Sequence, residues 1–311
     1  MAQNMKGKHL TSILDLSTEE IRQIFHMTCR LKQETHSGQT HHILPGRVLG
    51  MIFEKPSTRT RVSFEAGIYQ LGGTGLYLSS NDLQLGRGET VGDTAQVLSR
   101  YLDGIMARVF SHNTITELAR YSRVPVINGL SDYEHPCQVL ADLFTVEEKF
   151  GHLEGLKLAY IGDGNNVCNS LMYICAKLGV NFASAHPNKF FPTDEVIEKT
   201  REISSKSNAT IELGTDPVTA VKGAHAIYTD VWVSMGDEKD EASRLKEFAP
   251  YQVNSKLMEH AEDHGIVLHC LPAHRGQEIT DEVLDGPRSA VWDEAENRLH
   301  VQKALMALMM R

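Results

Sequence analysis

Residues 156–185 read LKLAYIGDGNNVCNSLMYICAKLGVNFASA: an apolar run of strand length, a turn with two glycines, an amphipathic stretch and a second apolar run. This order predicts a strand over 156–162, a helix over 167–178 and a strand over 180–185. Two strands joined through a helix belong to a parallel sheet with the helix on one of its faces. The stretch therefore predicts an α/β fold.

The same alternation extends over most of the chain. Further apolar runs of strand length lie at 48–53, 75–78, 104–110, 124–128, 225–230 and 265–270, and helical candidates at 62–71, 90–101, 136–150, 193–205 and 295–309. Because roughly 150 residues make one domain, a chain of 311 residues suits two. We expect two doubly wound domains, each with a central parallel β-sheet flanked by helices.

The boundary between the domains is expected near Gly151. Pro136 suits the first turn of a helix and Gly151 suits its C-terminal cap, so one helix should end there before a new strand begins. We expect a first domain over 1–150 and a second over 151–292. The last helix, 293–311, is rich in Met and Leu, and we expect it to pack back onto the first domain.

The composition excludes several classes of protein. The chain is 41% hydrophobic and 23% charged, which argues against intrinsic disorder, and its net charge of −9 argues against general binding to nucleic acid or to anionic membranes. No window reaches the ~18 consecutive apolar residues of a membrane span, and no signal peptide is evident at the start, so we expect a cytoplasmic protein. Five cysteines without paired spacing are expected to be free thiols.

The turn after the strand 156–162 raises one alternative function. Gly162 and Gly164 begin a dinucleotide fingerprint, which would favour an NAD-dependent dehydrogenase. The third glycine position holds Val167, however, and the next strand ends in His186 instead of an acidic residue that could bind a ribose. The fingerprint is incomplete, and we interpret Asn166 as an amide that faces a ligand crevice.

Ligands of parallel sheets bind at the carboxyl ends of the strands, and the polar residues found there are informative. After the strand 48–53, Ser57 or Thr58 could cap a helix whose first turn carries Arg59 and Arg61. Cations in a first turn oppose the helix dipole unless an anion lies between them and the free N–H groups. A bound phosphate would resolve this conflict; the alternative is a solvated, slightly unfavourable helix start.

Another candidate group starts the helix at Pro136. His135 and Gln138 lie close together on that helix start and could donate hydrogen bonds to a carbonyl oxygen or an amide. Here the helix dipole favours a neutral histidine. An ordinary capping role for His135 is an equally good interpretation.

The second domain ends two of its strands with candidate ligands. Asp230 could pair with an ammonium group, although a plain surface turn is the simpler interpretation of its surroundings. Cys270 is either inert packing or, with a charge partner nearby, a thiolate. His269 and His274, with His41 and His42, lack the spacing and companion ligands of a zinc site, so we expect no metal.

Several of these segments together resemble one family, the aspartate/ornithine carbamoyltransferases, over essentially the full chain. The motifs Ser57-Thr58-Arg59-Thr60-Arg61 and His135-Pro136-Cys137-Gln138 are similar to those of the whole superfamily. The stretch from Asp230 through Ser234-Met235-Gly236 and the run His269-Cys270-Leu271-Pro272 resemble the motifs of the members that use ornithine.

The resemblance implies roles for the matching residues. Carbamoyl phosphate would be held by Ser57, Thr58, Arg59, Thr60, Gln84, Arg108, His135, Pro136, Cys137, Gln138, Cys270, Leu271 and Arg298. Ornithine would be held by Asn166, Asp230, Ser234 and Met235. Cys270, Asp230, Arg108 and His135 would be the catalytic residues, Gln84 would enter from a neighbouring subunit of a homotrimer, and the bond before Pro272 is a plausible cis peptide.

The implied reaction transfers the carbamoyl group to the δ-amino group of ornithine, giving citrulline and phosphate, as in arginine biosynthesis and the urea cycle. It needs no cofactor, because hydrogen-bond donors and cations can stabilise the charge that develops on the carbonyl oxygen and on the phosphate. The attacking amine must be neutral, and Cys270 is the candidate for accepting its proton or holding it neutral. Putrescine or N-acetylornithine as substrate, and a catalytically silent scaffold of the same fold, are the alternatives.

Overall fold

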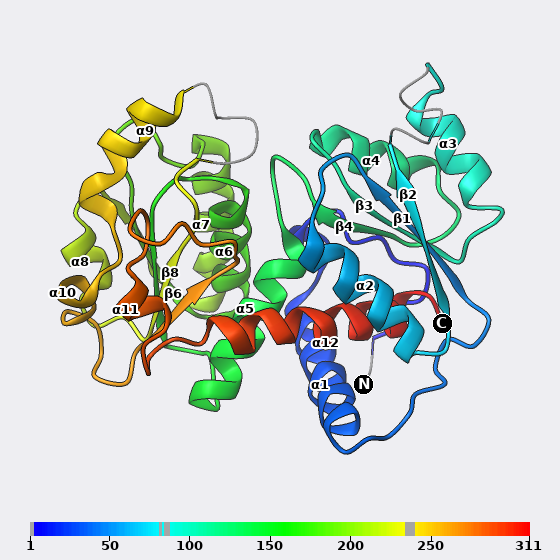
Figure 1. The fold of residues 1–311 in the computed structure, drawn as a ribbon, viewed down its shortest axis with the longest axis horizontal. Coiled ribbons are helices and arrows are strands. Elements are labelled where there is room, and N and C mark those ends of the chain that lie inside the picture. Colours follow the sequence, from blue (N-terminus) through cyan, green and yellow to red (C-terminus); the bar gives the residue numbers. More distant parts are fainter. Residues whose placement is uncertain (1–2, 81–82, 84–87, 234–239) are drawn as a thin grey trace. The chain divides into compact units, whose positions relative to one another are not determined.

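The computed structural model describes residues 3–80, 83, 88–233 and 240–311 (Figure 1). These residues form two compact units. The first comprises Met1–Leu140 with Glu296–Arg311, and the second comprises Ala141–Ala295. Within the described ranges, every helix is too short or too polar to cross a bilayer.

The first unit is built on a four-stranded parallel sheet in the order β2-β1-β3-β4. Its strands are β1 (Val48–Phe53), β2 (Thr74–Ser79), β3 (Gly104–Arg108) and β4 (Val126–Leu130). The helices that belong wholly to this unit are α1 (Thr18–His36), α2 (Thr58–Gln70), α3 (Val91–Leu98) and α4 (His112–Tyr121). The central strands β1 and β3 are buried almost throughout, as their continuous apolar runs require.

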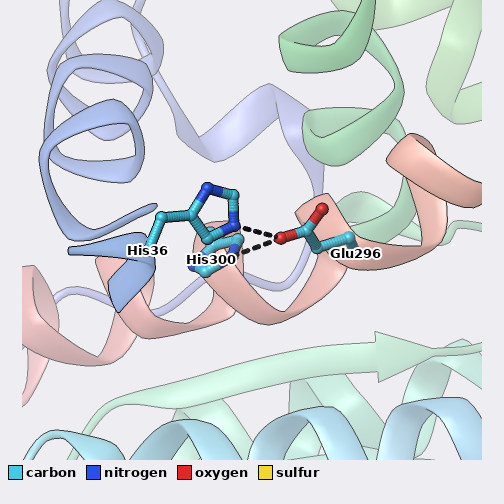
Figure 2. Close-up of side chains that lie close together, drawn as sticks. All are labelled: His36, Glu296 and His300. Atoms are coloured by element: carbon cyan, nitrogen blue, oxygen red, sulfur yellow. Dashed lines mark hydrogen bonds and ion pairs between the residues drawn. The ribbon is translucent and has the colours of Figure 1, made fainter. Parts of the chain in front are cut away.

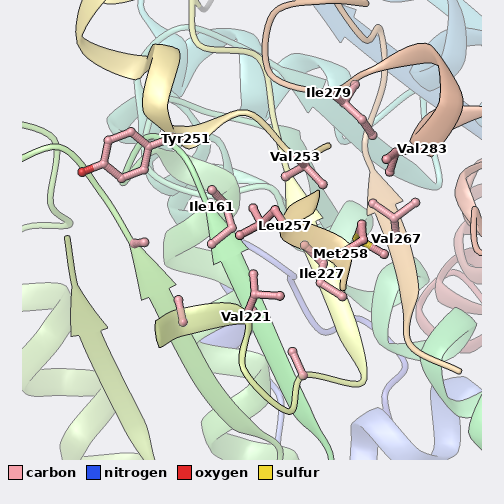
Figure 3. Close-up of a cluster of buried hydrophobic side chains, with 14 of the residues drawn as sticks. Ile161, Val221, Ile227, Tyr251, Val253, Leu257, Met258, Val267, Ile279 and Val283 are labelled. Atoms are coloured by element: carbon pink, nitrogen blue, oxygen red, sulfur yellow. The ribbon is translucent and has the colours of Figure 1, made fainter. Parts of the chain in front are cut away.

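The second unit is built on a five-stranded parallel sheet in the order β7-β6-β5-β8-β9. Its strands are β5 (Lys157–Ile161), β6 (Asn181–Ala185), β7 (Ile211–Gly214), β8 (Ala226–Thr229) and β9 (Ile266–His269). Its helices are α6 (Asn166–Leu178), α7 (Asp194–Ser207), α8 (Pro217–Val221), α9 (Glu241–Phe248), α10 (Ser255–Met258) and α11 (Asp281–Leu284). One core cluster joins the inner strands to the segments around Tyr251, Val253 and Val283 (Figure 3).

Two longer helices, α5 (Pro136–Phe150) and α12 (Val291–Met309), have residues in both units. Within the first unit, α12 packs closely on α2. A Cβ added to Gly67 would lie 3.1 Å from the terminal methyl of Met306 and 3.2 Å from Cγ of Lys303. The small residue at 67 therefore allows this close helix packing, which holds the turns of α12 after Glu296 beside α2.

The expected fold class is confirmed: both sheets are parallel and flanked by helices. One strand, β7, was not expected from the sequence. It is a short edge strand in which only Ile211 and Leu213 are apolar, and none of its residues is fully buried. An edge strand that buries so little has no long apolar run, and hydrophobic patterning does not reveal it.

Candidate active site

Ser57 begins α2 directly beyond the carboxyl end of β1. Its Oγ accepts a hydrogen bond from the backbone N–H of Thr60 at 3.2 Å, which caps the helix as expected. Thr60 is buried, whereas Thr58 is exposed and Arg59 is half-buried. The sequence predicts that Arg59 and Arg61 both lie beside a bound anion. In the structure, Arg61 is exposed on the outer face of the helix.

The contacts of Arg61 explain why it takes no part in such a site. Its guanidinium forms an exposed ion pair with Glu65 one turn along the helix, with Nε 3.3 Å from Oε2, and lies 4.0 Å from the centre of the Tyr77 ring. Of the two arginines in the first turn, only Arg59 is thus a candidate for anion binding.

Arg298 joins the start of α2 to the start of α5 within the first unit. One guanidinium nitrogen donates to Oε1 of Gln138, and the other donates to Oγ1 of Thr60 at 3.3 Å. Arg298 is 3% exposed, and among the described residues no carboxylate forms an ion pair with it. A buried cation that meets only neutral groups implies that an anionic ligand completes the site.

His135 lies among three arginines. It is buried, and its pKa is well below the usual range because burial disfavours the charged form and because Arg298, Arg108 and Arg59 repel a proton. The imidazole is therefore neutral at physiological pH, in agreement with the expectation from the helix dipole. These three guanidinium groups all act on one ring, so the surroundings of His135 are strongly electropositive.

Pro136 and Cys137 follow at the start of α5 and are both buried. The Cys137 thiol faces the interior, where its Sγ donates to the carbonyl oxygen of Asn128 at 3.4 Å. Burial raises the pKa of Cys137 to about 12. This cysteine is a packed, inert thiol, and its side chain offers no charge to a ligand.

The loop that carries His135 is fastened by the N-terminal segment. The Glu134 carboxylate accepts a hydrogen bond from the hydroxyl of Ser12 and, at 3.0 Å, from the backbone N–H of Ile13. The hydroxyl oxygen of Ser131 accepts a hydrogen bond from the backbone N–H of Glu134 at 3.2 Å. Ser12 and Glu134 lie 122 positions apart, and no local pattern in the sequence connects them.

In the second unit, Asp230 lies directly after β8 and is 6% exposed. Its carboxylate accepts hydrogen bonds from Nδ2 of Asn165 at 2.8 Å, from Sγ of Cys270 at 3.0 Å and from the N–H of Val231 at 2.8 Å. Asn165 also caps α6 through its Oδ1, which accepts from two backbone N–H groups. The carboxyl ends of β5, β8 and β9 thus contribute to one polar cluster, as the strand-end rule predicts.

The surroundings of Cys270 favour the protonated thiol. Its pKa is raised well above that of a free thiol by burial, by the charge of Asp230 and by the hydrogen bond to that carboxylate. Cys270 is therefore a protonated donor at neutral pH and not a thiolate that could take a proton from the substrate. Cys270 does lie beside a charged group, the carboxylate of Asp230. Because this charge is negative, it stabilises the protonated thiol relative to the thiolate.

The segment after Cys270 is held rigidly from both sides. Nε2 of His269 is 3.0 Å from Oε1 of Glu278, and Nδ1 of His269 accepts from the N–H of Leu271 at 2.9 Å. Leu271 has φ of 57°, and the Leu271–Pro272 bond is cis, as the resemblance implied. Ligand atoms of Asp230, His269 and Cys270 lie within 4.8 Å of one another, but both nitrogens of His269 already have partners.

The incomplete dinucleotide fingerprint has a structural role. A Cβ on Gly164 would lie 2.3 Å from the backbone nitrogen of Pro192, so the chain itself occupies the side on which a pyrophosphate would approach a fingerprint glycine. His186 is buried and uses both ring nitrogens, one at 2.7 Å from the carbonyl of Gly162 and one at 2.8 Å from the hydroxyl of Ser184. These contacts argue against the dehydrogenase alternative.

The remaining predicted ligands are placed only in part. Asn166 is the first residue of α6 and is half-buried, next to Asn165, which bonds Asp230. Gln84, Ser234 and Met235 lie outside the described residues.

Comparisons with known proteins now identify the family. Residues 8–148 match the carbamoyl-phosphate-binding domain of aspartate/ornithine carbamoyltransferases, and residues 154–309 match the aspartate/ornithine-binding domain. The chain belongs to the aspartate/ornithine carbamoyltransferase family. Within this family, His135, Arg59 and Arg108 fall in the domain named for carbamoyl phosphate, whereas Arg298 and the cluster around Asp230 fall in the domain named for aspartate or ornithine.

Individual relatives of this carbamoyltransferase-family chain are similar over its whole length. It is 54% identical over 310 residues to the ornithine carbamoyltransferase of Thermococcus kodakarensis, covering 100% of this chain and 98% of that protein. The anabolic ornithine carbamoyltransferase of Pyrococcus furiosus is 52% identical over 310 residues, covering 100% of this chain and 98% of that protein. A solved structure of the Pyrococcus furiosus protein has a TM-score of 0.97 at 51% identity and covers 99% of each chain. That of Gloeobacter violaceus has a TM-score of 0.88 at 46% identity, with coverage of 99% and 100%.

Proposed function

We propose that this protein transfers the carbamoyl group of carbamoyl phosphate to the δ-amino group of L-ornithine, giving L-citrulline and phosphate. The observation that carries the proposal is the buried guanidinium of Arg298, which bonds only neutral side chains beside the neutral His135 and two further arginines. Such a group of cations suits a small phosphorylated ligand. The family membership and the ornithine carbamoyltransferases among the relatives support the same activity.

The first unit supplies groups for carbamoyl phosphate. The start of α2 and the end of β3 would grip the phosphate through Ser57, Thr58, Arg59, Thr60 and Arg108. His135, Gln138 and Arg298 would donate to the carbamoyl group, where negative charge develops as the amine attacks. Gln84 is assigned to the same ligand from a neighbouring subunit.

The second unit supplies groups for the amino acid. Asp230 would bind the α-ammonium of ornithine, since its carboxylate already collects donors at the end of β8. Asn166, Ser234 and Met235 complete the proposed ornithine site. Cys270 and Leu271 would face the reacting amine and the carbamoyl group.

The chemistry balances without a cofactor. The neutral δ-amine forms a C–N bond to the carbamoyl carbon, the C–O bond to phosphate breaks, and the amine proton leaves with the phosphate as hydrogen phosphate. Because the Cys270 thiol keeps its proton, we assign it the role of hydrogen-bond donor to Asp230 and not that of a base. The protein's contribution is charge stabilisation and orientation.

We further propose a division of the chain into a carbamoyl-phosphate domain, residues 1–150 with the final helix 293–311, and an ornithine domain, residues 151–292. A homotrimer is proposed as the assembly. In its support, α2 and the edge strand β2 expose a group of apolar side chains just before the segment that contains Gln84: Val62, Tyr69, Leu76 and Tyr77. All five cysteines are free thiols, which supports a reducing, cytoplasmic location.

One assay tests the activity and its substrate. Citrulline formation from carbamoyl phosphate is measured with ornithine, and product formation is measured in parallel with putrescine, N-acetylornithine and aspartate. We expect turnover with ornithine, because putrescine has no α-carboxylate and N-acetylornithine has no α-ammonium for Asp230. Preferred turnover of putrescine or N-acetylornithine would replace the proposed substrate, and phosphate binding without turnover of any amine would indicate a silent scaffold.

A further inference from the structure

Three metal-ligating side chains meet on the first unit, away from the residues assigned to either substrate. His36 is the last residue of α1, and Glu296 and His300 lie one turn apart on α12. Figure 2 shows both imidazole rings directed at the same carboxylate oxygen. Nε2 of His36 is 2.6 Å, and Nε2 of His300 is 3.4 Å, from Oε1 of Glu296.

We propose that His36, Glu296 and His300 form a binding site for one zinc ion. Two imidazoles and one carboxylate are a ligand set that Zn²⁺ uses in proteins, with a fourth position left for water. The three ligand atoms lie within 4.8 Å of one another. Two atoms that each lie about 2.1 Å from one ion are at most about 4.2 Å apart, so small side-chain rotations suffice to bring all three onto one metal.

The protonation states suit a metal ligand. Burial, with the charge of Lys303, lowers the pKa of His300 to about 4, so its imidazole is neutral at physiological pH, and the proton that Nε2 donates to Glu296 would move to Nδ1 when a metal binds Nε2. Burial alone would raise the pKa of Glu296, but its hydrogen bonds to His36 and His300 keep that pKa below the usual range. Glu296 is thus ionised, and it offers zinc a negative charge.

The positions in the fold make the site accessible and preorganised. The side chain of His36 is 57% exposed and that of Glu296 is 39% exposed, while that of His300 is 1% exposed. An i, i+4 pair on one helix sets the spacing of two ligands, and the third comes from the end of another helix. An ion can therefore reach His36 and Glu296 from solvent, and the buried His300 supplies the third ligand.

Two lysines limit the affinity. Lys32 and Lys303 are close enough to affect the protonation of His300, and a dication would be repelled by both. Lys32 donates to Oδ1 of Asn297 at 2.8 Å, which keeps its ammonium near the site. We therefore expect a dissociation constant on the order of micromolar, weaker than that of a buried structural zinc site.

Zinc at this site would tie the last turn of α1 to the turn of α12 that contains Arg298. Since a ligand that binds only the folded protein stabilises it, zinc at about 100 times its dissociation constant should raise the unfolding temperature measurably. This readout does not depend on the proposed enzymatic activity.

The experiment uses the full chain with Cys270→Ser as background, because Asp230, His269 and Cys270 are a second candidate cluster. Zinc binding is measured by calorimetry and by thermal unfolding in three further variants. His36→Ala and Glu296→Gln each remove one ligand, and His26→Ala removes an exposed histidine of the same helix as the matched control.

We expect one zinc per chain in the background protein and in His26→Ala, and binding at least about tenfold weaker in His36→Ala and Glu296→Gln. Substituted cobalt should show the absorption of nitrogen and oxygen ligands, without a thiolate band. Binding that is unchanged in His36→Ala, or no binding in the background protein, would overturn the proposal and leave the three residues as an ordinary ion pair.

Discussion

The thiol of Cys270 donates a hydrogen bond to the carboxylate of Asp230, with Sγ 3.0 Å from Oδ1. A cysteine that donates to a carboxylate must carry its proton, and the neighbouring negative charge together with burial raises its pKa well above that of a free thiol. The two residues therefore act as one unit, in which the thiol orients and partly satisfies the carboxylate.

The protonated state of Cys270 predicts low reactivity toward alkylating agents. Because the thiolate is the nucleophile, we expect iodoacetamide at about pH 8 to modify the exposed Cys29 well before Cys270. Peptide mass spectrometry over a time course measures both rates in one sample. Alkylation of Cys270 as fast as that of Cys29 would show that its thiol is ionised and would return it to the role of a base.

The contacts of Asp230 predict a selective loss of amino-acid binding in Asp230→Asn. The amide keeps an oxygen that can accept from Cys270, but it loses the charge that would attract the α-ammonium. We expect ornithine binding to weaken by about a hundredfold, which corresponds to about 2.7 kcal/mol. Carbamoyl-phosphate binding should remain as in the parent.

Calorimetry measures the affinity of Asp230→Asn for ornithine and for carbamoyl phosphate in separate titrations. Asp263→Asn, an exposed carboxyl in the same unit, is the matched control and should bind both ligands normally. Equal losses for the two ligands in Asp230→Asn would contradict the assignment of Asp230 to ornithine.

Sequence patterns predicted the elements that are strongly apolar and the strand ends that carry ligands. The continuous apolar runs 48–53 and 104–110 predict buried strands, and β1 and β3 lie within these ranges. Asp230 and Cys270 could be named because each follows such a run directly. Whether a residue follows directly after a strand is a local property, so it can be predicted from the sequence.

Contacts between distant segments could not be predicted in this way. Glu134 accepts a hydrogen bond from Ser12, and Asp230 accepts one from Asn165, and neither pairing leaves a spacing pattern in the sequence. The protonation of Cys270 also depends on burial and on a carboxylate 40 positions away. Charge states follow from three-dimensional surroundings, which is why the sequence could not decide between an inert thiol and a thiolate at Cys270.

The close approach at Gly164 predicts a packing defect in Gly164→Ala. The new methyl group would lie 2.3 Å from the nitrogen of Pro192 and 2.6 Å from the carbonyl carbon of Phe191, and backbone atoms cannot move aside cheaply. We expect a loss of about 1–3 kcal/mol in the free energy of unfolding. Gly214→Ala is the matched control in the same unit, because a Cβ there meets nothing within 4 Å.

Thermal and denaturant unfolding of the two variants provide the comparison. A Gly164→Ala protein as stable as Gly214→Ala would show that the Phe191–Pro192 segment does not fill the space beside the glycine, and the dinucleotide alternative would then need direct testing with NAD.

The buried guanidinium of Arg298 leads to a prediction about both ligand binding and the protonation of His135. Arg298→Met removes a cation that repels the proton of His135, so the pKa of His135 should rise toward its ordinary value. The same change removes donors to the proposed carbamoyl group, and we expect binding of carbamoyl phosphate to weaken by about tenfold or more. Arg298→Lys keeps the charge but not the two-pronged geometry that reaches Gln138 and Thr60.

The two readouts separate charge from geometry. In Arg298→Lys, the pKa of His135, followed by NMR of the labelled imidazole, should stay low while carbamoyl-phosphate binding weakens. In Arg298→Met both should change. Arg120→Met, which removes an exposed arginine of α4, should change neither. If the pKa of His135 stayed low in Arg298→Met, with the fold intact by circular dichroism, the field of Arg298 would not reach the imidazole, and only Arg108 and Arg59 would remain as cations that act on it.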